Sequence, residues 1–296
     1  KAAHADFIPA ERHAYRYKDQ KLPVHKDWKG NKVIEQGKPL WVQNQRNSRH
    51  GIEYAYYTHL DMEQYYQRYC ETLLAVDDSV GELMHWLDES GESENTLVLY
   101  MGDNGFLFGE HGLIDKRNAY EESMRIPLMV KFPAVVSKGL KVSSMVANID
   151  IAPTLLDVAG VRIPEHMDGR SFSPMLKGKN TPWRQYLLYE YFWERNYPQT
   201  PTTHSLRGDR FKYIRYHGIW DKDELYDLES DPDELQNLIR EPQHQSRIKD
   251  MNRVLFDMLE LSKGREIPLQ RDRGTQFFHR AAGGSPASGF TSDFYQ

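Results

Sequence analysis

The chain has 296 residues, of which 39% are hydrophobic and 27% are charged. These proportions exclude an integral membrane protein, a collagen-like fibre and a wholly disordered chain. The 38 basic and 43 acidic residues give a net charge of −5, so we expect neither a nucleic-acid partner nor a membrane partner. Cys70 is the only cysteine, which excludes an internal disulfide.

The first 55 residues have no sustained period, and we expect long loops with short helical turns there. Apolar residues recur at spacings of three and four over 61–89, which predicts a helix closed by Gly91. Apolar runs at 96–101 and 126–132 predict strands, the first buried on both faces, and Val142–Val146 follows them as a further apolar segment. A helix is expected near 151–159, with Asp150 as its N-cap and Gly160 as its stop.

This alternation of strands and helices predicts an α/β fold with part of a mostly parallel central sheet flanked by helices. The pattern changes after about Pro174. Short strands are expected at 186–192, 203–206, 211–216 and 224–228, followed by an amphipathic helix over 243–263. We therefore expect a smaller C-terminal α+β subdomain with a short antiparallel sheet.

The sequence Asp103-Asn104-Gly105 directly follows the first predicted strand. Ligands of open α/β sheets bind outside the carboxyl ends of the strands. A carboxylate and an amide oxygen side by side suit Ca²⁺, with Mg²⁺ as a second possibility. The alternative is an ordinary Asp-Asn-Gly turn.

The segment 108–118 is punctuated by glycine and too polar for a core, and it contains His111 and Lys116. A lysine downstream of a metal loop can hold an anion, although a solvated surface lysine is the simpler interpretation. His4 lies among small and apolar residues, where an imidazole could be held for proton transfer. Most loop histidines have no such role.

Taken together, these segments resemble the carboxyl-terminal part of a formylglycine-type sulfatase, a family of the alkaline-phosphatase superfamily. The resemblance is closest to polysaccharide sulfatases, including those that act on 6-sulfated N-acetylglucosamine. It follows the family order along most of the chain as far as about Lys263. The matching segments are residues 1–9, 102–105, 109–117, 120–128, 148–156, 224–228, 231–232 and 237–238.

The resemblance implies roles for particular residues. Asp103 and Asn104 match the second pair of Ca²⁺ ligands. His4 and Lys116 match the residues that hold the sulfate and its bridging oxygen, with His4 as general acid for the leaving alcohol. For His111 the resemblance implies only a supporting position next to these groups, without direct contact with the sulfate.

The resemblance also implies three segments: residues 1–175 as the C-terminal part of the catalytic α/β domain, 176–264 as a subdomain with substrate subsites, and 265–296 as an extended tail. The family's nucleophile motif, Cys or Ser followed by x-Pro-x-Arg, is absent from these 296 residues. The first pair of metal-binding aspartates is absent too. We therefore expect a fragment whose formylglycine lies in a missing N-terminal half of the same enzyme.

The stretch 189–197, together with His204 and Arg207, is rich in aromatic and charged residues. Sugars bind by stacking on aromatic rings and by directional hydrogen bonds, so Trp193, His204 and Arg207 are our substrate-binding candidates. The alternative is a subdomain core built from aromatic residues.

The expected function is hydrolysis of sulfate esters on a glycan by a calcium-dependent sulfatase. A phosphate or phosphonate monoester hydrolase of the same superfamily, or a non-catalytic glycan-binding relic, are the alternatives. Family analogy places the protein in the periplasm or outside the cell.

Overall fold

The computed structural model describes residues 4, 7–23, 37–46, 48, 50–52, 61–194 and 197–265. The tail expected at 265–296 therefore lies outside the described residues, except for Arg265. No helix in the described part is both long and apolar enough to cross a lipid bilayer. The helices, including short 3-10 turns (η), are η1 (Glu11–His13), α2 (Leu40–Gln45), α4 (Met62–Ser90), η2 (Ser93–Asn95), η3 (Glu110–Gly112), α5 (Glu121–Met124), η4 (Asn148–Asp150), α6 (Ile151–Val158), α7 (Ser173–Leu176), η5 (Pro242–His244) and α8 (Gln245–Leu261).

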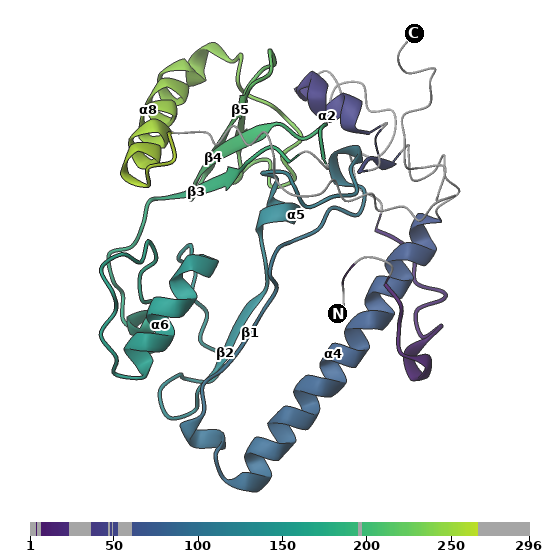
Figure 1. The fold of residues 1–296 in the computed structure, drawn as a ribbon, viewed down its shortest axis with the longest axis vertical. Helices are drawn as coiled ribbons and strands as arrows, with labels where there is room; N and C mark the ends of the chain where they lie inside the picture. The colour runs from purple at the N-terminus through teal and green to yellow at the C-terminus, as the bar shows by residue number, and fades with distance from the viewer. Residues whose placement is uncertain are drawn as a thin grey trace.

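Helix α4 has 29 residues and runs along one side of the molecule (Figure 1). It begins where the Asp61 carboxylate accepts a hydrogen bond from the Gln64 amide at 3.2 Å. It ends at Gly91, whose φ of +75° only glycine adopts without strain. The helix predicted over 61–89 is therefore confirmed nearly to the residue.

Strands β1 (Val98–Met101) and β2 (Leu128–Lys131) form a two-stranded ribbon in the middle of the molecule (Figure 1). They pair antiparallel, with Leu99 opposite Val130. All four residues of β1 are half-buried, so the expectation of a strand covered on both faces is wrong for the described chain. The mostly parallel pairing is also not what these two strands show. Hydropathy predicted the strands, but their direction depends on the path of the 26 residues between them.

The C-terminal subdomain is a four-stranded antiparallel sheet in the order β3-β4-β5-β6. Helix α8 packs against β4 and β5, and Leu206, Tyr213 and Leu255 are fully buried between the sheet and the helix. The predicted α+β subdomain is therefore confirmed. Its strands are β3 (Tyr186–Tyr191), β4 (Thr202–Gly208), β5 (Phe211–His217) and β6 (Glu224–Asp227).

Helix α6 confirms the helix predicted near 151–159, and Gly160 follows it with a φ of +70°. Asp150 is at the predicted N-cap position of α6, but its side chain makes no capping hydrogen bond to that helix. Its buried carboxylate accepts the Ala147 and Arg170 amides, each at 2.8 Å, and forms an ion pair with Arg184. It therefore ties together the segments on both sides of the helix. Residues 142–146 form no strand.

Candidate active site

Asp103 and Asn104 lie directly after β1, and both are exposed. The Asp103 Oδ1 atom accepts the Asn104 amide at 2.9 Å, and Asn104 Nδ2 donates to the Gly105 carbonyl at 2.8 Å. These bonds hold the two side chains in one turn. Asn104 uses its amide nitrogen within the turn, so its carbonyl oxygen, Oδ1, points to a partner from outside the turn.

Lys116 lies next to this turn. Its ammonium group donates to Asn104 Oδ1 at 3.1 Å, across 12 positions of sequence. The backbone of Lys116 is also held, because its carbonyl accepts the Ser123 hydroxyl of α5. Gly105 closes the loop from the other side, since its amide donates to the Ser123 carbonyl at 2.9 Å. A Cβ on Gly105 would lie 1.9 Å from the Glu122 carbonyl oxygen, so this close approach requires glycine.

The segment that carries His4 lies against the same loop. The Phe7 amide donates to the His4 carbonyl at 3.2 Å. The Phe7 ring lies 6.1 Å from both the Phe106 and the Phe108 ring, centroid to centroid. His4 is exposed and three residues from this packing. Phe7 therefore packs against the chain that follows the Asp103 turn, through Phe106 and Phe108.

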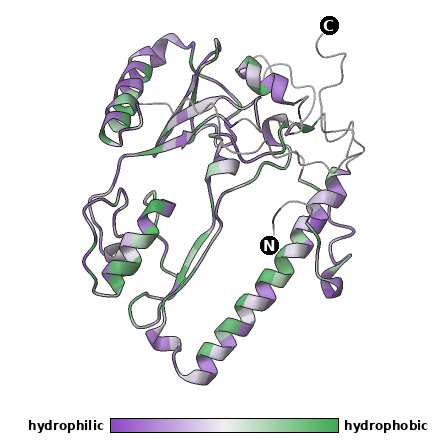
Figure 2. Cartoon of the chain, in the orientation of Figure 1, coloured by the Kyte–Doolittle hydropathy of each residue, from purple (hydrophilic) through white to green (hydrophobic). Residues whose placement is uncertain are grey.

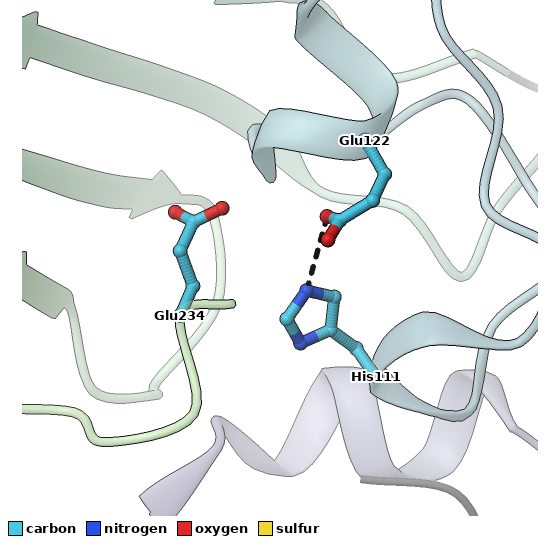
Figure 3. A group of neighbouring side chains, drawn as sticks. All are labelled: His111, Glu122 and Glu234. Atoms are coloured by element: carbon cyan, nitrogen blue, oxygen red, sulfur yellow. Dashed lines mark hydrogen bonds and ion pairs between the residues drawn. The ribbon is translucent and has the colours of Figure 1, made fainter. Parts of the chain in front are cut away.

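The His111 side chain points into the interior of the protein, away from the exposed Asp103 turn. Its side chain is buried, its ring stacks on Tyr120 with centroids 3.8 Å apart, and its Nε2 atom lies 3.4 Å from Glu122 Oε2. Figure 3 shows His111, Glu122 and Glu234 converging from three segments. One nitrogen or oxygen atom from each lies within 4.8 Å of the others, which is the spacing of a metal site. The chemistry of the neighbours decides whether a cation fits.

That neighbourhood disfavours a metal ion. Lys212 is fully buried, and its ammonium nitrogen lies 2.7 Å from Glu234 Oε1 and 2.9 Å from Glu121 Oε1. The second oxygen of Glu234 accepts the Glu121 amide at 2.6 Å. A divalent ion would have to displace these bonds and approach a buried positive charge. Lys212, Glu121 and Glu234, together with Arg207, instead form a network of ion pairs that joins α5 to the C-terminal subdomain, and we call this network the polar lock.

Burial and charge shift the pKa values of the two glutamates in opposite directions. Burial raises the pKa of Glu234 to about 7, although Lys212 acts to lower it. Burial alone would also raise the pKa of Glu121, but Lys212 and Arg207 together lower it to about 2. Glu121 is therefore a firmly ionised partner of two cations, and Glu234 is poised to take up a proton.

The chemistry of Asp103 and Asn104 fits a calcium ion. One is a carboxylate and the other an amide oxygen, both hard donors, and they are adjacent and exposed. Cys70 does not fit a formylglycine precursor. It lies inside α4, where burial raises the pKa of its thiol, and the surrounding sequence lacks the nucleophile motif. The described chain therefore brings two oxygen donors and a lysine together, and Cys70 does not lie in the nucleophile motif.

The three predicted substrate residues lie in the subdomain in different surroundings. His204 is 1% exposed and its Nδ1 atom lies 2.8 Å from His217 Nε2, so it belongs to the core rather than to an open subsite. Arg207 pairs with Glu121 at 3.2 Å and is part of the polar lock. Trp193 is half-exposed, and its indole donates to the Pro198 carbonyl at 3.3 Å. Trp193 remains a substrate candidate.

Lys212 and Glu234 were not among the residues that the sequence singled out. Strand periodicity offered a signal for Lys212, because it shares the inward face of β5 with the buried Ile214 and Tyr216. A lysine at an inward position requires a buried partner. Glu234 lies in an irregular segment after β6, and no local pattern marks it.

The sequence was compared with models of protein families and with known proteins, and two family models match it. The model described as "Sulfatase" matches residues 5–161, and "N-sulphoglucosamine sulphohydrolase, C-terminal" matches residues 109–260. An N-acetylglucosamine-6-O-sulfatase of Bacteroides thetaiotaomicron is 36% identical over 202 residues, covering 65% of this chain and 35% of that protein. An arylsulfatase of Clostridium perfringens is 30% identical over 268 residues, covering 89% of this chain and 52% of that protein.

A solved structure, that of BT4656 in complex with its substrate D-glucosamine-2-N,6-O-disulfate, resembles this chain with a TM-score of 0.74. The two are 26% identical, and the match covers 89% of this chain and 64% of that one. The chain therefore spans about a third of the first curated relative and about half of the second.

Proposed function

Because the chain belongs to the sulfatase family, within the alkaline-phosphatase superfamily, we propose that it supplies part of an active site that hydrolyses sulfate esters on a glycan. The observation that carries the proposal is the contact of Lys116 with Asn104 Oδ1 at 3.1 Å. It brings a cation next to two adjacent oxygen donors, and the proposed reaction uses both a lysine and a metal ion held by such donors.

We propose Ca²⁺ as the metal, held in part by Asp103 and Asn104. A divalent cation there would offset the negative charge of the sulfate oxygens. We propose that the Lys116 ammonium group holds the bridging oxygen of the ester. His4 is proposed as the general acid that donates a proton to the leaving alcohol, because breaking the S–O bond otherwise leaves an alkoxide.

The proposed substrate class is a sulfated saccharide, with 6-sulfated N-acetylglucosamine as the first candidate. Support comes from the similarity to an N-acetylglucosamine-6-O-sulfatase and to a structure solved with a sulfated glucosamine. For the compartment, we propose the periplasm or the cell exterior, because sulfated polysaccharides are extracellular polymers.

We further propose that the formylglycine nucleophile belongs to another part of the same enzyme, which packs against α4 and the β1–β2 ribbon. A hollow of about 660 Å³ lies between these elements and is lined mainly by apolar side chains such as Leu73, Val80 and Val130. Trp86 and Met129 are 59% and 58% exposed. Figure 2 shows hydrophobic residues at intervals along α4 and on the β1–β2 ribbon. Apolar area of this kind marks an interface.

Calcium titration of the 296-residue chain tests the metal part of the proposal. We expect Ca²⁺ to bind and to raise the melting temperature, and Asp103→Ala to lose both effects. Asp250→Ala removes an exposed carboxylate from α8 and is the matched control. Unchanged Ca²⁺ binding by Asp103→Ala would contradict the assignment.

Turnover of N-acetylglucosamine-6-sulfate tests the reaction. We expect no turnover by the 296 residues alone, because the nucleophile motif is absent. A longer parent reading frame with a Cys/Ser-x-Pro-x-Arg motif should hydrolyse the ester, and Lys116→Ala should abolish this activity there. Turnover by the isolated chain would refute the division of the active site. A preference for phosphate esters with bound Zn²⁺ or Mn²⁺ would identify a phosphomonoesterase instead.

A further inference from the structure

A second hollow of about 630 Å³ lies between the start of α2 and the segment that connects β5 to β6. It lies between α2 and the C-terminal subdomain, and its lining includes neither Asp103 and Asn104 nor Lys212, Glu121 and Glu234. Its walls combine apolar, amide and charged side chains from three segments. The lining residues are Lys38, Leu40, Gln43, Ile219, Trp220, Asp221, Lys222 and Arg240.

The apolar part of the hollow is centred on Trp220. Its side chain is 105% exposed relative to an extended reference, so the indole contacts almost no other part of the described chain. Leu40 and Ile219 beside it are 59% and 38% exposed. A tryptophan is the side chain with the most to gain from burial, and a flat exposed indole offers a stacking surface for a sugar ring.

The charged part of the hollow is cationic at the rim. Lys222 and Arg240 both line the hollow, which places the two cations on the same wall. Burial and then the positive charge of Arg240 lower the pKa of Lys222, while Asp221 and Glu224 act to raise it. The Lys38 ammonium group is buried and donates to the Tyr226 hydroxyl at 2.9 Å and to the Glu234 carbonyl at 2.7 Å, so it belongs to the interior rather than to the rim. An anion bound between Lys222 and Arg240 would relieve their repulsion.

Asp221 is the carboxylate in this wall, and the backbone engages both of its oxygens. Oδ2 accepts the Trp41 amide at 2.8 Å, and Oδ1 accepts the Lys222 amide at 2.8 Å. The bond from Trp41 anchors the β5–β6 connection to α2. The backbone that carries Trp220 and Lys222 is therefore tied to α2.

We propose that this hollow is a subsite for a sulfated saccharide, in which Trp220 stacks on a sugar ring and Lys222 and Arg240 hold a sulfate group. The stacking ring and paired cations point to an anionic sugar. The choice of sulfate over another anion rests on the proposed function. A nucleic acid is disfavoured by the net charge of −5.

Isothermal titration of the 296-residue chain with a heparin-derived hexasaccharide tests this subsite. The titration is run in EDTA, so that calcium at Asp103 makes no contribution. We expect Trp220→Ala and Arg240→Ala each to weaken binding by about tenfold or more. The matched controls are Trp86→Ala, which removes another exposed indole, and Lys249→Ala, which removes an exposed cation from α8; both should bind like the parent chain. Circular dichroism checks that each variant is folded.

An unsulfated hexasaccharide of the same backbone is the second arm and should bind at least tenfold more weakly than the sulfated one. Equal affinity for the two saccharides would overturn the role of the cations. Unchanged affinity in both Trp220→Ala and Arg240→Ala would overturn the location. Failure of the chain to bind Ca²⁺ would refute the proposed catalytic site and leave this result standing, because the titration contains no calcium.

Discussion

Replacing Lys212 with methionine removes a buried ammonium group that Glu121 and Glu234 share. The side chain is 0% exposed, and its nitrogen lies 2.9 Å and 2.7 Å from the two carboxylates and 2.9 Å from the Ala119 carbonyl. Removing one partner of a buried ion pair costs about 3–5 kcal/mol, because the remaining charge is left without compensation. We expect Lys212→Met to lower the free energy of unfolding by this amount at pH 8.

The loss should depend on pH, because Glu234 can take up a proton. Its folded pKa of about 7 lies above the ordinary 4.5, so the folded state holds a proton that the unfolded state has already released. The contribution of Glu234 to stability therefore falls as the pH rises from about 4.5 to 7. Without Lys212 its pKa rises further, which extends this fall above pH 7. The variant should be closer to the parent chain at pH 5.5 than at pH 8.

Glu121 behaves in the opposite sense. Its folded pKa of about 2 lies below the ordinary 4.5, so its contribution is present above pH 4.5 and is lost as the pH falls toward 2. Glu121 keeps Arg207 as a partner in the variant, at 3.2 Å. The uncompensated charge in Lys212→Met is therefore mainly that of Glu234.

Urea unfolding followed by far-ultraviolet circular dichroism, at pH 5.5 and pH 8, measures both effects. The double variant Lys212→Met, Glu234→Gln should recover part of the loss at pH 8, because it removes the stranded carboxylate. Lys249→Met, at an exposed position of α8, is the control and should change stability by less than about 0.5 kcal/mol. A loss below about 1 kcal/mol at pH 8, or an equal loss at both pH values, would refute the reasoning.

Two further substitutions test the packing around the site and in the subdomain. Gly105→Ala should lower the free energy of unfolding by about 1–3 kcal/mol and weaken Ca²⁺ binding, since its Cβ would lie 1.9 Å from the Glu122 carbonyl oxygen. Gly81→Ala is the control inside α4, where nothing lies within 4 Å of the added Cβ, and it should raise the free energy of unfolding by about 0.5–1 kcal/mol. Calcium calorimetry and thermal unfolding of both variants measure these effects. Leu255→Ala should cost about 2–5 kcal/mol in urea unfolding because Leu255 is fully buried under the sheet. Leu261→Ala on the same helix, 86% exposed, should cost less than about 0.5 kcal/mol, and similar losses for both leucines would contradict the packing of α8.

The lysine contact at Asn104 connects the fold to the proposed chemistry. Leu107, Leu113 and Tyr120 are buried in one cluster with Ile214 and Tyr226 of the subdomain sheet, so the loop after β1 is held by the subdomain as well as by its own hydrogen bonds. The polar lock around Lys212 joins the same two parts. Destabilising the lock should therefore also loosen Lys116, although Lys212 lies outside the proposed site.

Local features of this protein were readable from the sequence. Helix α4 follows from its apolar spacing, the Asp61 cap and the Gly91 stop, all within 31 residues of chain. The strands of the C-terminal sheet and helix α8 follow from the same kinds of signal. The segment order that resembles a sulfatase was also present in the sequence, because each of its motifs consists of residues that are neighbours in the chain.

Only the tertiary structure decided which distant segments meet. The antiparallel pairing of β1 with β2, the burial of His204 and the convergence of Lys212, Glu121 and Glu234 all depend on contacts between residues far apart in the chain. Caps, turns and periodicity act between covalent neighbours, so they appear in any window of sequence. Whether a charged side chain is buried depends on the distant residues that pack over it. Those residues therefore decide whether a lysine is exposed at the surface or buried in an ion-pair network such as that of Lys212.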